Sequence, residues 1–93
     1  MAGLLDKLER VERTVNIYKK KTNELIREIN VDSIPLDKLQ TFVVAIEDDY
    51  LLYLPYELNK KQLNSLLVEI NVKLKTDFRT EIYVLEATGI YNW

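Results

Sequence analysis

A single apolar periodicity near the start of the chain constrains the fold more than any other feature of the sequence. Eight residues between positions 4 and 29 follow one another at alternating spacings of four and three. They are Leu4, Leu8, Val11, Val15, Tyr18, Thr22, Leu25 and Ile29. This spacing is typical of the a and d positions of a heptad, which keep one apolar stripe on one face of a helix. Since no proline interrupts it, the sequence predicts a long amphipathic helix over residues 1–30.

The length of this helix predicts that the protein self-associates. A helix over residues 4–29 would span roughly 39 Å, whereas strands of about six residues span roughly 20 Å. A sheet of such strands would leave half of the stripe uncovered, and soluble monomers avoid an exposed stripe of that kind. We therefore predict a homo-oligomer, with a dimer favoured, in which the eight heptad residues form a coiled coil. Tyr18 and Thr22 are poor residues for a parallel zipper, so a helix packed on its own domain is the alternative.

The middle of the chain predicts a β-hairpin. Residues 30–40 read as a connector, in which Pro35 excludes a helix through the two residues before it. The run from Thr41 to Glu47 is β-branched and aromatic, which favours a central strand with Val44 and Ile46 in the buried core. A short acidic turn follows, and residues 50–54 return as a second strand.

The last third of the chain predicts one helix and one further strand. Asn59 and Gln62 have the spacing of a capping box at the start of a helix over residues 60–75. Residues 81–86 then read as a third strand. The predicted fold class is α+β, a long N-terminal helix followed by a β-β-α-β unit. Its sheet is three-stranded and mixed with order 2-1-3, and the whole chain forms one domain over residues 1–93.

The composition excludes several kinds of chemistry. The chain has no cysteine and no histidine, which removes thiol catalysis and the commonest general base and metal ligand. The three successive acids of Glu47–Asp49 do not have the spacing of a calcium loop, and two glycines are too few for a phosphate-binding loop. We therefore expect no enzyme activity, no cofactor and no metal. Without a membrane span or signal peptide in the sequence, we expect a cytoplasmic location.

Two groups of residues are candidates for binding. Aromatic residues are common anchors of protein interfaces, and the partner-binding candidates are Tyr50, Tyr53, Tyr56 and Trp93. Residues 4–29 carry a net charge of +2 while the rest of the chain carries −4, so a basic stripe on the helix could follow phosphates. The nucleic-acid candidates are Arg13, Lys19, Lys20, Lys21 and Arg27.

These features together predict a small acidic protein that binds other proteins. We expect a self-associating inhibitor, adaptor or regulatory subunit that covers the surface of a larger target. The frequent Lys, Asn, Ile and Tyr residues favour an AT-rich genome, such as that of a phage or mobile element. The alternative function is nucleic-acid binding through the basic stripe.

Overall fold

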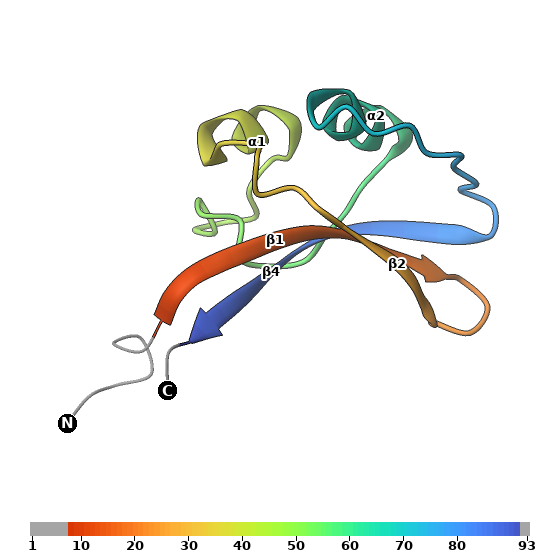
Figure 1. Cartoon of the computed structure of the whole chain (residues 1–93), viewed down its shortest axis with the longest axis horizontal. Helices are drawn as coiled ribbons and strands as arrows, with labels where there is room; N and C mark the ends of the chain where they lie inside the picture. The colour runs from red at the N-terminus through yellow and green to blue at the C-terminus, as the bar shows by residue number, and fades with distance from the viewer. Residues whose placement is uncertain (1–7, 92–93) are drawn as a thin grey trace.

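The computed structural model describes residues 8–91, which form a twisted four-stranded sheet with two short helices on one face (Figure 1). The strands are β1 (Leu8–Lys19), β2 (Leu25–Asn30), β3 (Tyr56–Glu57) and β4 (Glu81–Tyr91). The helices are α1 (Leu36–Phe42) and α2 (Lys60–Glu69). The sheet has order β2-β1-β4-β3, and every neighbouring pair is antiparallel.

The predicted N-terminal helix and its coiled coil are wrong. Residues 8–30 instead form a β-hairpin in which β1 and β2 are joined by a turn at residues 20–24. Asn23 in this turn has a φ of 59°, a left-handed conformation that asparagine tolerates better than most residues. On β1, Val15 and Ile17 share one face of the strand and are buried, so the apolar residues follow a period of two here.

The predicted three-stranded mixed sheet is also wrong. The run from Thr41 to Glu47 ends α1 and then enters a loop, and residues 50–54 belong to the same loop. Val44 is 84% exposed and Ile46 is 52% exposed, so neither lies in the core. The centre of the sheet, which this run was expected to occupy, is formed by β1 and β4, which pair along their whole lengths. α1 begins directly after Pro35, a favourable residue at a helix start.

The end of the chain is closer to the prediction. The capping box is confirmed, since the Asn59 side chain accepts from the Gln62 backbone N–H and the Gln62 side chain accepts from that of Asn59. α2 is shorter than predicted and ends at Glu69. The predicted strand over residues 81–86 lies within β4, which continues to Tyr91.

The core lies between the sheet and the two helices. Val15 pairs with Leu85, and Ile17 pairs with Tyr83, so these four side chains line the helix-facing surface of the sheet. The other fully buried residues come from the helices and the segments that lead into them: Val31, Leu39, Leu52, Leu63 and Leu66. Burying one such side chain contributes about 1.5–3 kcal/mol, so this layer supplies most of the stability.

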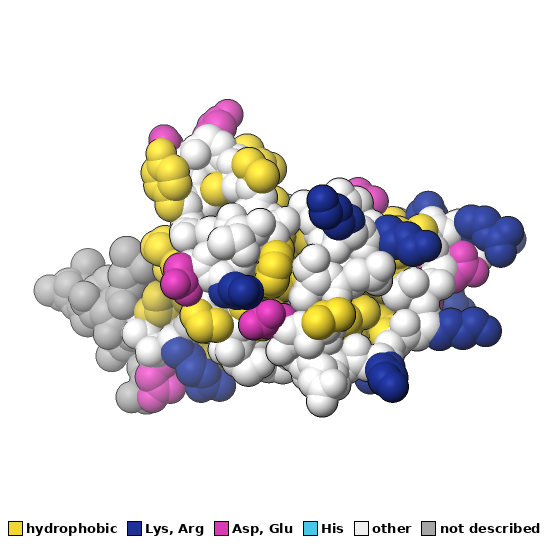
Figure 2. All heavy atoms as spheres, turned by 90° about the horizontal axis from the view of Figure 1, so that it is seen from above, with side chains coloured by type: hydrophobic (Ala, Val, Ile, Leu, Met, Phe, Trp, Pro, Cys, Tyr) yellow, Lys and Arg dark blue, Asp and Glu magenta, His cyan; other side chains and the backbone are white. Residues whose placement is uncertain are grey.

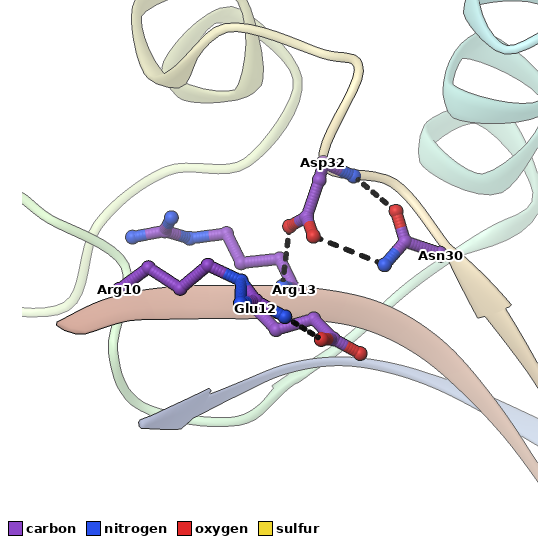
Figure 3. A network of polar contacts seen from close by, with 5 residues as sticks. All are labelled: Arg10, Glu12, Arg13, Asn30 and Asp32. Carbon is purple, nitrogen blue, oxygen red and sulfur yellow. Dashed lines mark hydrogen bonds and ion pairs between the residues drawn. The ribbon is translucent and has the colours of Figure 1, made fainter. Parts of the chain in front are cut away.

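Polar contacts fix the path of the chain as it leaves β2 (Figure 3). The carboxylate of Asp32 accepts from the backbone N–H of Arg13, at 2.8 Å, and from the Asn30 side chain, at 3.0 Å. The backbone N–H of Asp32 donates to the Asn30 side chain. Asp32, which lies just beyond the end of β2, thereby provides a hydrogen-bond acceptor for the Arg13 N–H on β1. This contact directs the chain over the sheet towards α1.

The structure predicts opposite costs for two truncations. Leu66→Ala removes a fully buried side chain and should lower the free energy of unfolding by about 2–5 kcal/mol. Val44→Ala removes exposed atoms and should change it by less than about 0.5 kcal/mol. Urea unfolding followed by circular dichroism measures both. A Val44→Ala cost as large as that of Leu66→Ala would contradict the exposed position of Val44.

Candidate functional site

The segment of residues 44–54 between α1 and β3 gathers exposed apolar side chains. Among the described residues, nine large hydrophobic side chains are exposed, and six of them lie in this segment. They are Val44, Ile46, Tyr50, Leu51, Tyr53 and Leu54. We call residues 44–54 the apolar loop. Large exposed apolar surfaces on soluble proteins commonly mark interaction sites.

The carboxylate of Asp49 organises the apolar loop from within. It accepts from the backbone N–H groups of Tyr53 and Leu54 at 2.9 and 3.0 Å, and from the Tyr56 hydroxyl at 2.6 Å. The Tyr56 hydroxyl accepts in turn from the backbone N–H of Ile46 at 3.1 Å. Both ends of the loop are therefore tied to one ionised side chain and one buried phenol.

These contacts shift the pKa of two groups. Partial burial raises the pKa of the Asp49 carboxyl, but the hydrogen bonds from Tyr56, Leu54 and Tyr53 and the charge of Arg13 together hold it below its ordinary 3.8. Burial, and then the hydrogen bond to Asp49, raise the pKa of the Tyr56 hydroxyl above its ordinary 10.0. At neutral pH the loop is consequently held by a carboxylate and a neutral phenol.

Further contacts fasten the apolar loop to the sheet and to α1. The Arg13 guanidinium donates to the Leu51 carbonyl oxygen and lies 5.7 Å from the centre of the Tyr53 ring. The Gln40 side chain donates to the Tyr50 carbonyl oxygen at 2.6 Å. Leu52 is 1% exposed and has a φ of 54°, a left-handed conformation that costs a non-glycine residue about 1–3 kcal/mol. The backbone of the loop is thus held at several points, with Leu52 buried beneath it and six other apolar side chains exposed.

Acidic side chains border the apolar loop. Glu47 and Asp48 are exposed at its turn, next to Ile46 and Tyr50. Figure 2 shows apolar and acidic side chains together at the end of the molecule near the chain termini, while lysines and arginines crowd the opposite end. The apolar loop therefore presents an apolar surface with a negative border.

The structure separates the predicted partner-binding residues. Tyr50 is 66% exposed and Tyr53 is 47% exposed, and both lie on the apolar loop. Tyr56 is buried and holds the loop from below, while Trp93 lies outside the described residues. Sequence reasoning missed Val44, Ile46, Leu51 and Leu54 as surface residues, because a run of β-branched and aliphatic residues favours a buried strand.

The predicted nucleic-acid residues do not form one stripe. Lys19, Lys20 and Lys21 lie at the turn between β1 and β2, and Arg27 follows on β2. Arg13 lies near the middle of β1, where its side chain holds the apolar loop. Four of the five residues therefore share one end of the molecule.

The predicted oligomerisation residues are dispersed. Val15 and Ile29 pair with each other in the core of the protein's own sheet, while Thr22 and Leu25 are exposed at the far end of the hairpin. The remaining described members, Leu8, Val11 and Tyr18, are partly buried, and Leu4 lies outside the described residues. Because these residues form a hairpin and not a long helix, the uncovered helical stripe that predicted a dimer does not exist. Self-association itself stays a prediction.

The face of the sheet opposite the helices carries a polar network. The Thr14 hydroxyl donates to the Asn16 side chain at 2.8 Å, and Asn16 donates to the Glu86 carboxylate at 2.7 Å. The Tyr18 hydroxyl donates to the same carboxylate, and this bond raises the pKa of Tyr18 above its ordinary 10.0. The network crosslinks β1 to β4 through the Glu86 carboxylate.

Within residues 8–91, no three acidic side chains converge as metal ligands would. None of the described helices is long and apolar enough to cross a membrane.

Comparison with known proteins gives one family match. Residues 12–86 match the model of a family described as a domain of unknown function, DUF7683. This range contains the whole apolar loop and the basic end of the molecule. No curated protein and no solved structure matches the chain.

The contacts of Asp49 predict a pH-dependent loss of stability. Because its folded pKa lies below 3.8, its contribution is complete above that pH and is lost as the pH falls through the folded value. The parent should melt at a higher temperature than Asp49→Asn at about pH 7, and the difference should be smaller at about pH 2. Thermal denaturation at both pH values measures this, with Asp48→Asn, on the neighbouring exposed acid, as the matched control. A difference that persists at low pH would contradict the role of the carboxylate.

Proposed function

Because the chain belongs to the DUF7683 family, whose description assigns no activity, we propose from its structure that it is a non-enzymatic protein-binding module. The observation that supports this proposal is the rigid apolar loop with its six exposed hydrophobic side chains. We propose that the loop covers a surface of a larger protein, so that the chain acts as an inhibitor, adaptor or regulatory subunit. The absence of catalysis and the cytoplasmic location stay predictions.

The rigidity of the apolar loop favours a binding role over imperfect packing. Five carbonyl or N–H groups of its backbone are held by hydrogen bonds with side chains. Asp49, Arg13 and Gln40 hold four of these groups directly. The fifth, the N–H of Ile46, donates to the Tyr56 hydroxyl, which in turn donates to Asp49. A loop that is already ordered before it binds loses little conformational entropy on association, which strengthens binding. The left-handed Leu52 adds a local cost that the free protein carries. These features are those of a preorganised interface.

The composition of the apolar loop indicates the chemistry of the partner. Tyr50 and Tyr53 supply large, rigid side chains of the type that dominates interface energetics. Glu47 and Asp48 at the border favour a partner whose apolar pocket is surrounded by lysine and arginine. Occlusion of such a surface requires only complementary shape and charge, and no reactive group in this chain.

A photocrosslinking experiment identifies the partner and tests the site. A benzophenone amino acid at Tyr50 should crosslink one protein in the producing cell, while the same probe at Val68, which is 78% exposed on α2, should not. With that protein purified, Tyr53→Ser plus Leu54→Ser should weaken binding by about tenfold or more, since central apolar anchors carry most interface energy.

Val68→Ser is the control variant for this measurement, because it removes an exposed hydrophobic side chain outside the loop. It should leave the dissociation constant within about twofold of the parent. Equal crosslinking at both positions, or unchanged affinity of the Tyr53 and Leu54 variant, would refute the proposal. Light scattering on the parent and the loop variant reports whether the same loop also pairs two copies.

A further inference from the structure

The end of the molecule opposite the apolar loop contains a basic pocket that the proposed function does not use. It lies between the β1–β2 turn and the turn that precedes β4, and its volume is about 400 Å³. It is lined by Lys19, Lys20, Lys21, Ile26, Arg79, Thr80 and Glu81. Figure 2 shows the lysine and arginine side chains that crowd this end. Three of the five residues that the sequence suggested for nucleic-acid binding line this pocket.

Backbone contacts hold the two turns of the basic pocket together. The backbone N–H of Lys20 donates to the Thr80 carbonyl oxygen at 2.9 Å, and the Lys20 ammonium donates to the Phe78 carbonyl oxygen. Each turn is also closed internally, the first by Asn23 N–H to Lys19 oxygen at 2.8 Å and the second by Glu81 N–H to Asp77 oxygen at 2.9 Å. The backbone that carries the cationic side chains is therefore held in place by these hydrogen bonds.

Two acids at the turn that precedes β4, Glu81 and Asp77, make hydrogen bonds with other groups. The Glu81 carboxylate accepts from the Tyr83 hydroxyl at 2.9 Å. Asp77 accepts from the backbone N–H of Arg79 at 3.0 Å and lies 3.7 Å from its guanidinium. Within residues 8–91, Lys19, Lys20 and Lys21 form no ion pair with any carboxylate. Four cations and one carboxylate thus line the pocket, in a chain whose overall charge is −2.

Like charges in such a cluster repel one another, and a bound anion relieves this repulsion. A volume of about 400 Å³ lies within the range of small-ligand sites and exceeds what a single inorganic ion needs. Ile26 is 44% exposed and gives the pocket one apolar wall beside its cations. A nucleotide matches this arrangement, since its phosphates are anionic and its base has an apolar face.

We propose that the basic pocket binds the phosphate groups of nucleotides, either free or within a single strand of nucleic acid. Lys19, Lys21 and Arg79 contact phosphate oxygens, and Lys20 contributes its remaining donors while it stays bound to Phe78. Ile26 packs against a base. A lipid bilayer fits less well, because the cations surround a concavity and a bilayer presents an extended flat surface.

Fluorescence anisotropy with a short labelled single-stranded oligonucleotide, as DNA and as RNA, tests the proposal. Four phosphate contacts predict a slope of log affinity against log salt of about −3, from about 0.7 per contact. In Lys19→Gln plus Lys21→Gln the slope should fall to about half that value, and low-salt affinity should fall by about tenfold. Competition with unlabelled ATP distinguishes a free nucleotide from a strand as the tighter ligand, and either supports the proposal.

Lys38→Gln plus Lys61→Gln is the matched control, because both lysines are exposed, one on each helix, outside the basic pocket. It should bind as the parent does. The Lys19 and Lys21 variant should also melt no lower than the parent, since it relieves repulsion, whereas a purely structural role would lower its melting temperature. Equal loss in the control, or no binding of oligonucleotide or ATP at low salt, would overturn the proposal. Binding of phosphatidylserine vesicles alone would overturn it as well.

Discussion

The antiparallel pairing of β1 with β4 is the interaction on which the rest of the structure depends. It runs from the pair Leu8 and Tyr91 to the pair Lys19 and Glu81, so it joins the beginning of the described chain to its end. β2 adds to one side of this pair and the two-residue β3 to the other, and both helices pack on its inner face. The apolar loop and the basic pocket are both fastened to it, the loop through Arg13 near the middle of β1 and the pocket at the Lys19 end. Neither surface could be held in place without the ladder that connects them.

Local sequence patterns predicted the local structure at one end of the chain and failed at the other. The capping box of Asn59 and Gln62 uses side-chain and backbone groups that are three residues apart, so its signal is complete within the sequence. The heptad spacing of residues 4–29 is compatible with a helix, but Val11, Val15 and Ile17 also lie on one face of a strand. β-branched residues lose side-chain freedom in a helix, and this preference, with the turn at Asn23, was the signal that favoured the hairpin.

The candidate site was only partly predictable for a physical reason. Tyr50 and Tyr53 are exposed as expected of interface residues, but the sequence does not show that Asp49 binds Tyr56 and the backbone of the loop. That set of contacts depends on β3 being placed beside β4, which is a tertiary event. From the adjacent sequence alone, an aliphatic residue such as Val44 is therefore predicted to lie in the core. In the structure, hydrogen bonds between the loop backbone and the side chains of Arg13 and Asp49 keep this segment at the surface. The basic pocket likewise requires two turns that are distant in the sequence.

The pairing of Leu8 with Tyr91 also determines how the chain can be folded and rearranged. The principal ladder joins residues that are far apart in sequence, and forming such contacts is slow because the intervening chain must first be closed. A circular permutant that links the two ends and opens the chain in the connector after α2 would make β4 and β1 consecutive. The same ladder would then be a local hairpin, with a lower contact order and the same native packing. Folding speed in this architecture therefore depends on where the chain is opened, and can change while the native packing of the sheet stays the same.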